Sequence, residues 1–183
     1  MKLFEIITLF PDAFPATLDL SIIKKSRGQQ WDMNIHDMRR FGVGKHFQVD
    51  DEVFGGSAGM LIRPDVIDNA VTHVLTNRTR FLRRIFLSPR GKVMNQVWVE
   101  KLALEDSDVL LLCGRYEGVD ARAIEYFQFE EVSIGNYILA GAEAAALVMM
   151  EAVIRKIPGV IGNTQSFAQE TFVDNEISEP RYT

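Results

Sequence analysis

The feature that most constrains the fold of this sequence is its alternation of short apolar runs with longer stretches of helical periodicity. The run DVLLLC at 108–113 has no polar residue between its first position and its final cysteine, and the chain opens on a second run, KLFEIITL, at 2–9. Runs of this length are typical of strands buried on both faces of a parallel sheet. Their alternation with helices predicts an α/β domain with a mainly parallel sheet flanked by helices.

The expected elements follow from periodicity and from turn residues. We expect strands at 2–9, 31–35, 84–88, 108–113 and 130–134, and helices at 16–27, 64–77, 95–104, 120–126 and 142–156. The alternation of Trp31, Met33 and Ile35 with polar residues predicts an edge strand. Gly28 is expected to end the first helix, and Pro64 suits the first turn of the second.

Composition narrows the class of protein. The 183 residues are 47% hydrophobic and 25% charged, which is typical of one ordinary globular domain and excludes a disordered chain. The single cysteine, Cys113, has no partner within the chain, which indicates a reducing compartment. No uncharged apolar stretch is long enough for a membrane helix, and no signal peptide is evident. The sequence therefore predicts a cytoplasmic protein with no membrane partner.

The net charge of −5 argues against broad, sequence-independent binding of nucleic acid. Two local clusters could still contact RNA: Arg39 with Arg40, and the arginines at 78, 80, 83 and 84. The alternative, which the sequence alone favours for either cluster, is a set of solvated surface arginines.

Common catalytic signatures are absent from the sequence. There is no phosphate-binding loop, no dinucleotide fingerprint after the first strand, no serine elbow and no histidine pair at ligand spacing. Three strand exits stand out instead, LSPRG, CGRYEG and SIGNYILAGAE, because each joins glycine to small polar residues. Parallel sheets place ligands at such carboxyl ends. These loops either recognise an adenine through main-chain groups or are tight turns that need glycine for backbone reasons alone.

Several sequence blocks together resemble the bacterial tRNA (guanine-N1)-methyltransferases. They are ITLFPDAF, VDDEVFGGSAGMLIRPD, IFLSPRGKVMNQ, LLCGRYEGVDARAIE, EEVSIGNYILAGAEAA, RKIPGV and PRYT, in that family's order and spacing. The resemblance implies the SPOUT class of methyltransferase, with a C-terminal deep trefoil knot, a rare exception to unknotted topology. It implies S-adenosylmethionine as methyl donor and tRNA as substrate, with N1 of the guanosine 3′ of the anticodon (tRNA position 37) as acceptor. It also implies a homodimer with the active site between subunits.

By position, the resemblance assigns a cofactor pocket. Its expected residues are Leu87, Ser88, Pro89, Gly114, Tyr116, Glu117, Gly118, Ile134, Gly135, Asn136, Tyr137, Ile138, Leu139 and Gly141. Asn136 replaces the family's usual aspartate, and Ala142, Ala144 and Ala145 depart from its pattern around Glu143. Glu117 either binds cofactor or magnesium, or neutralises Arg115.

The resemblance assigns catalysis to Arg155, near the guanine oxygen, and proton removal to a carboxylate in the tail. Glu170 stands where the family has an aspartate, and Asp174 is the fallback base. Arg155 could alternatively form an ordinary helix pair with Glu151. Asp50, Gly59 and Met60 are expected to help recognise the guanine.

The tail differs in character from the rest of the chain. We expect residues 1–161 to form the catalytic domain and residues 162–183 to be a linker toward a helical tRNA-binding domain that this chain lacks. For such a chain we expect cofactor binding and dimerisation with weak methylation. The alternative function is a dimeric cofactor-binding module that is inactive on tRNA.

Overall fold

The centre of the molecule is a parallel sheet. The computed structural model describes residues 1–56, 58–76 and 78–162. Five strands lie in the order β2-β1-β6-β5-β7, and each neighbouring pair is parallel; they are β1 (Lys2–Thr8), β2 (Trp31–Asp37), β5 (Leu82–Val93), β6 (Asp108–Cys113) and β7 (Glu130–Ser133). Every residue of β6 is buried, because this strand lies at the middle of the sheet with helices on both faces. β2 is the edge strand that its alternation predicts.

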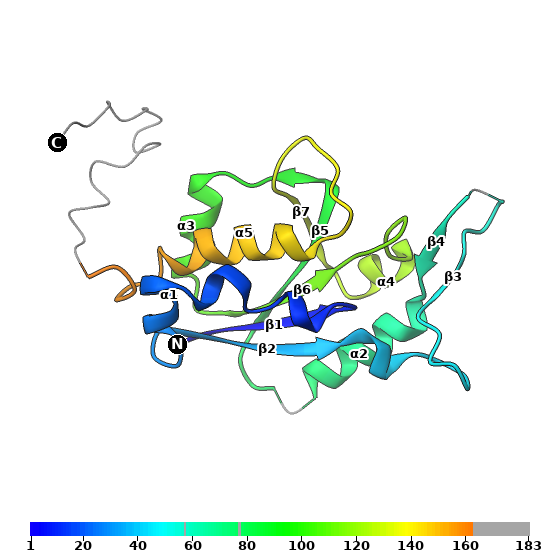
Figure 1. Ribbon diagram of the computed structural model, residues 1–183, viewed down its shortest axis with the longest axis horizontal. Helices are drawn as coiled ribbons and strands as arrows, with labels where there is room; N and C mark the ends of the chain where they lie inside the picture. The colour runs from blue at the N-terminus through cyan, green and yellow to red at the C-terminus, as the bar shows by residue number, and fades with distance from the viewer. Residues whose placement is uncertain (57, 77, 163–183) are drawn as a thin grey trace.

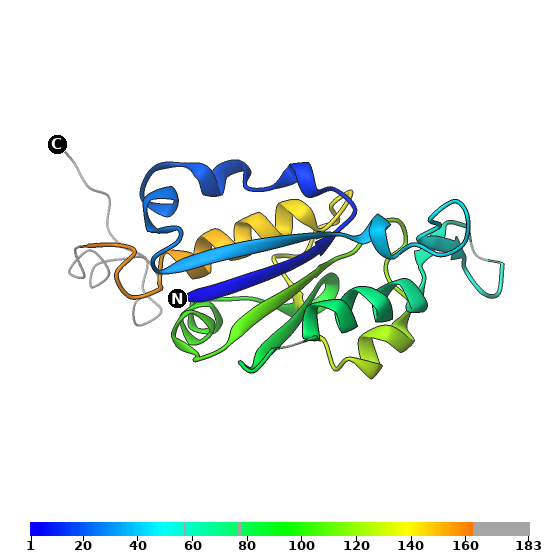
Figure 2. The same ribbon diagram turned by 90° about the horizontal axis from the view of Figure 1, so that it is seen from below.

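Helices cover both faces of the sheet (Figures 1 and 2). The helices α1 (Ser21–Ser26), α3 (Gln96–Leu104) and α5 (Glu143–Ile154) contribute to one apolar cluster. The helices α2 (Pro64–Leu75) and α4 (Ala121–Tyr126) contribute to a second cluster on the opposite face. The predicted α/β class, with a parallel sheet flanked by helices, is confirmed. No helix within the described residues combines the length and apolar character needed to cross a membrane.

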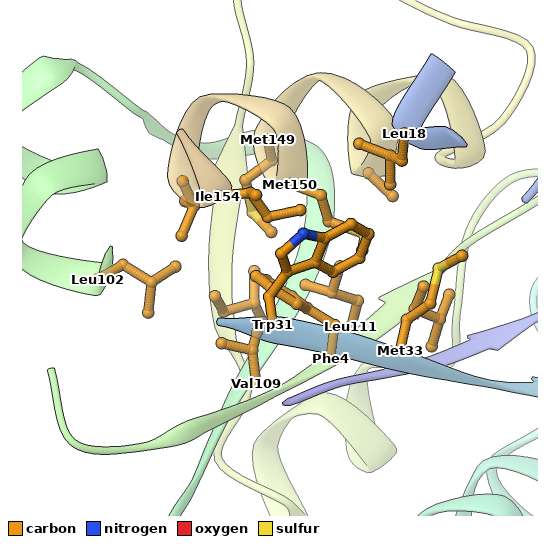
Figure 3. Close-up of a cluster of buried hydrophobic side chains, with 14 of the residues drawn as sticks. Phe4, Leu18, Trp31, Met33, Leu102, Val109, Leu111, Met149, Met150 and Ile154 are labelled. Carbon is orange, nitrogen blue, oxygen red and sulfur yellow. The ribbon is translucent and has the colours of Figure 1, made fainter. Parts of the chain in front are cut away.

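The larger core is centred on Trp31. Its ring is fully buried, contacts the Phe4 ring edge-on at 6.4 Å between centroids, and lies below Met149 and Met150 of α5 (Figure 3). The indole Nε1 donates to the Ile23 carbonyl at 3.0 Å, so its one polar atom is satisfied inside the core. This packing holds α5 along the sheet.

The single helix predicted at 16–27 is wrong. The structure has a short 3₁₀ helix, η2 (Ala16–Asp19), then an extended Leu20, and then α1. Leu18 and Ile23 are both buried in the same cluster. In a continuous helix, residues five apart point roughly 140° away from each other, so the break at Leu20 lets both side chains reach the core.

β5 continues well beyond the predicted 84–88 and pairs with β7 twice. Leu87 is opposite Val132, and after an interruption Lys92 is opposite the same residue. Gly91 lies in this interruption, and a Cβ there would overlap the backbone at Val132. The four residues between the two pairings therefore bulge out at the carboxyl end of the sheet, where Ser88 and Pro89 are found.

A small antiparallel hairpin adjoins the same end of the sheet. It consists of β3 (Asp50–Glu52) and β4 (Met60–Ile62), to the right of α2 in Figure 1. The hairpin follows η3 (Met38–Phe41), and a further 3₁₀ turn, η1 (Pro11–Ala13), follows β1. The Ile62 amide donates to the Gly118 carbonyl at 3.0 Å, and the Glu117 amide donates to the Met60 carbonyl at 3.0 Å. The hairpin is therefore tied to the loop that leaves β6.

Candidate active site

A pocket of about 460 Å³ lies at the carboxyl ends of β5, β6 and β7. This is where parallel α/β sheets bind ligands, and the volume is within the range of small-molecule sites. Its walls come from the exits of the three strands, with Leu61 of β4 and Ala145 of α5 closing the sides. The three glycine-bearing loops that stand out in the sequence therefore meet at one place.

The pocket brings together every residue predicted to bind cofactor except Asn136. The predicted residues that line it are Leu87, Ser88, Pro89, Gly114, Tyr116, Glu117, Gly118, Ile134, Gly135, Tyr137, Ile138, Leu139 and Gly141. Asn136 is exposed and is not part of the lining. The lining also contains residues that were not predicted to bind cofactor: Phe86, Arg90, Arg115, Ala121, Val132, Ser133, Ala140, Ala142, Ala145, Leu61 and Val119. Of these, Leu61 lies in β4 and Val119 in the loop after β6. The two belong to adjacent segments, since the bridge between Ile62 and Val119 joins β4 to the loop after β6.

The arginines of the pocket are paired with carboxylates outside its lining. Arg115 forms an ion pair with Glu143 at 2.8 Å, and Arg90 lies 3.6 Å from Glu131. Glu117 also lines the pocket, but the carboxylate that pairs with Arg115 is Glu143. Among the described residues of the lining, Glu117 is therefore a carboxylate that does not form an ion pair with either pocket arginine. Such a site suits a cationic ligand better than a phosphate.

Two glycines of the lining are required by close contacts. A Cβ on Gly141 would overlap the guanidinium of Arg115, and a Cβ on Gly114 would come within 3.0 Å of the Phe86 ring. The Ala142 amide donates to the Gly114 carbonyl at 3.2 Å. This hydrogen bond joins the chain at the C-terminal end of loop 134–141 to the end of β6.

The residues predicted to recognise guanine lie beside the pocket, without lining it. A Cβ on Gly59 would overlap the Glu117 side chain, and Met60 bonds to the Glu117 backbone. Asp50 is half-buried opposite Ile62 in the hairpin. The structure therefore gathers all three along the hairpin that borders Glu117.

The structure does not bring Arg155 to the pocket within one chain. Arg155 follows the last turn of α5, whereas Ala142, just before the first turn, lines the pocket. A twelve-residue helix separates them, a length of roughly 18 Å. The two candidate bases, Glu170 and Asp174, lie outside the described residues.

Three of the arginines that could contact RNA form ion pairs within the chain. Arg80 pairs with Asp106 and Asp108, Arg83 with Glu105 and Glu130, and Arg78 with Glu5 and Asp108, so these arginines bind within the chain and are not simply solvated.

Cys113 is fully buried, and burial raises the pKa of its thiol, so it is not a thiolate nucleophile. Among the described residues, no three histidine, cysteine or acidic side chains gather as a metal site.

These features define a class of protein: an α/β domain whose parallel strands end in one loop-built pocket that is suited to a cationic ligand. Comparison with known proteins identifies the family. The model of the tRNA (guanine-1)-methyltransferase TrmD family matches residues 1–183, so the chain belongs to this family of methyltransferases.

Individual relatives agree with that assignment. A tRNA (guanine-N(1)-)-methyltransferase of Ruegeria pomeroyi is 44% identical over 180 residues, covering 98% of this chain and 74% of the relative. Proteins of the same name are 44% identical in Agrobacterium fabrum, covering 97% of this chain and 76% of the relative, and 41% identical in Clostridioides difficile, covering 98% and 78%. The family predicted from the sequence blocks is confirmed.

Proposed function

We propose that this chain transfers the methyl group of S-adenosylmethionine to N1 of the guanosine immediately 3′ of the anticodon in tRNA. The observation that carries the proposal is the meeting of the family's three strand-exit loops in one pocket without an unpaired arginine. A sulfonium is a cation, so this charge pattern favours it over the phosphates of ATP or NAD.

The reaction needs three contributions from the protein. S-adenosylmethionine supplies a methyl carbon activated by its sulfonium, and that carbon–sulfur bond breaks as the bond to N1 forms. The pocket must align N1 with the methyl group, a basic group must take the N1 proton, and a cation must stabilise charge on the guanine oxygen. We assign stabilisation of the guanine oxygen to Arg155 and removal of the N1 proton to Glu170, with Asp174 as the alternative base.

The guanine would enter beside the β3–β4 hairpin. Gly59 and Met60 border Glu117 there, and Asp50 lies on the other strand of the same hairpin, opposite Ile62. For a magnesium ion in this site, we propose Glu117 of the pocket lining as the protein ligand, with substrate oxygens as further ligands. Mg²⁺ commonly binds through one or two carboxylates plus substrate. Omitting magnesium from the assay tests this part.

We infer that the working unit is a homodimer with an active site between subunits. Arg155 lies ten residues beyond Ala145, the last α5 residue in the lining, which is roughly 15 Å along the helix, so a partner would have to supply it. Exposed apolar residues lie in the pocket lining and on α5, including Ile138, Leu139 and Val148. A second copy that covered these side chains would remove apolar surface from water, which favours association.

We also infer the trefoil knot of the SPOUT class. The chain leaves β7, returns across the end of β6 through the bond from Ala142 to Gly114, and then enters α5. This return is consistent with a threaded path. A crossing analysis of an experimentally determined structure would test it.

The proposed activity is tested by analysing nucleosides from tRNA transcripts after incubation with the chain and S-adenosylmethionine. We expect N1-methylguanosine from a transcript with guanosine at position 37, and none from a matched transcript with adenosine there. Cofactor binding with no methylated product from either transcript would favour the alternative, a binding module. Calorimetric titration with S-adenosylmethionine, with ATP and NAD as controls, reports on the pocket separately.

A further inference from the structure

A buried carboxylate lies directly behind the pocket. Glu143, in the first turn of α5, is only 4% exposed and is not part of the pocket lining. One of its oxygens accepts from the Thr8 hydroxyl at 2.8 Å, at the end of β1. The other accepts from Arg115 Nε at 2.9 Å, at the end of β6. Glu143 therefore joins α5 to two strands at the site.

Arg115 connects this carboxylate to the pocket wall. Arg115 lines the pocket, and its guanidinium donates to the Ala140 carbonyl at 3.2 Å and lies 4.3 Å from the centroid of the Phe10 ring. Gly141 leaves the space that the guanidinium occupies. Arg115 thus holds loop 134–141 in place, and Glu143 in turn holds Arg115.

We propose that Glu143 is a positioning residue that also balances charge: by neutralising Arg115, it allows an arginine-bearing pocket to accept a sulfonium cation. The inference rests on the proposed function only in taking S-adenosylmethionine as the ligand. It adds a role for a residue that does not touch the ligand and acts on it through Arg115.

The charge component can be separated from shape. S-adenosylhomocysteine lacks the methyl group and the positive charge but keeps the rest of the molecule. At an effective dielectric constant of about 20, a lining guanidinium without its carboxylate would repel a sulfonium in the same pocket and weaken binding of the cation on the order of tenfold. The neutral thioether would not experience this repulsion.

The experiment measures the dissociation constants of both ligands by calorimetry for the full chain and its variants. For Glu143→Gln we expect S-adenosylmethionine to weaken about tenfold more than S-adenosylhomocysteine. The double variant Arg115→Met/Glu143→Gln removes both charges, and its ratio of the two constants should return toward that of the unchanged chain. Glu105→Gln is the matched control, because this carboxylate pairs with Arg83 away from the pocket; its ratio should not change.

Equal weakening of both ligands by Glu143→Gln would overturn the inference and leave a purely structural role. If Glu143→Gln does not fold, as judged by circular dichroism, Arg115→Met keeps the test decisive. That variant removes a cation, so a shift of the ratio against S-adenosylmethionine would also overturn the inference. If the unchanged chain binds neither ligand, the proposed function itself fails, which is a distinguishable result.

Discussion

Among single residues, Gly141 has one of the tightest steric requirements around the pocket. A side chain there would overlap Arg115, which cannot move freely because Glu143 and Ala140 hold it. We expect Gly141→Ala to displace the guanidinium and weaken S-adenosylmethionine binding on the order of tenfold, since overpacking typically costs about 1–3 kcal/mol. Calorimetry checks this, with Gly162→Ala as control because, apart from its chain neighbours, no atom of the described residues lies within 4 Å of its added Cβ. Unchanged affinity for Gly141→Ala would contradict the expectation.

The same residues show how far sequence reasoning reaches at this scale. The family motifs predicted 13 of the 24 residues of the pocket lining, because the loops that carry them follow strands that end together. The carboxylate that pairs with Arg115 could not be predicted from the sequence. The nearest acid in the sequence is Glu117, whereas the carboxylate that pairs with Arg115 is Glu143, 28 residues away on another element. Nothing in local spacing distinguishes these two.

Among the elements, β5 has the feature most open to test, its interruption at Gly91. The Cβ of Gly91→Ala would meet the backbone of β7, which cannot yield as a flexible side chain can. We expect the variant to lose about 1–3 kcal/mol of unfolding free energy, measured by urea denaturation. Gly162→Ala should be nearly neutral. If both variants had the same stability, the close approach of β5 to β7 would not be energetically important.

Periodicity located the elements better than their ends. The strand at 108–113 matches β6 residue for residue, because an apolar run between polar residues has clear limits. The pattern at 16–27 predicts one continuous helix, but the structure has two short helices there, an arrangement that buries both Leu18 and Ile23. The hairpin β3–β4 was not anticipated, since its strands are three residues each and glycine-rich sequence separates them.

In the whole molecule, alternation predicted the class of fold but not the order of its strands. β6 lies between β1 and β5, although it follows both in the sequence. That insertion depends on contacts between distant segments, such as Phe4 opposite Val109 and Ile85 opposite Leu111. Local patterns carry no information about such pairings, so the parallel class is predictable and the arrangement is not. The place of the pocket at the carboxyl ends of the strands is predictable from the parallel class, whereas the residues that line it depend on which strands lie side by side.

If the active site lies between subunits, two inactive variants should complement each other in a mixed dimer. Arg155→Ala keeps the pocket intact, whereas Gly141→Val should block it through Arg115. Each variant alone should have little methyltransferase activity. If the partner supplies Arg155, mixed dimers contain one complete site, and random pairing of equal amounts restores roughly a quarter of the activity of the unchanged chain. Mixing after mild denaturation and refolding, followed by the N1-methylguanosine assay, measures this. If Arg155 instead acted on the pocket of its own chain, no mixed dimer would hold a complete site and mixing would restore nothing.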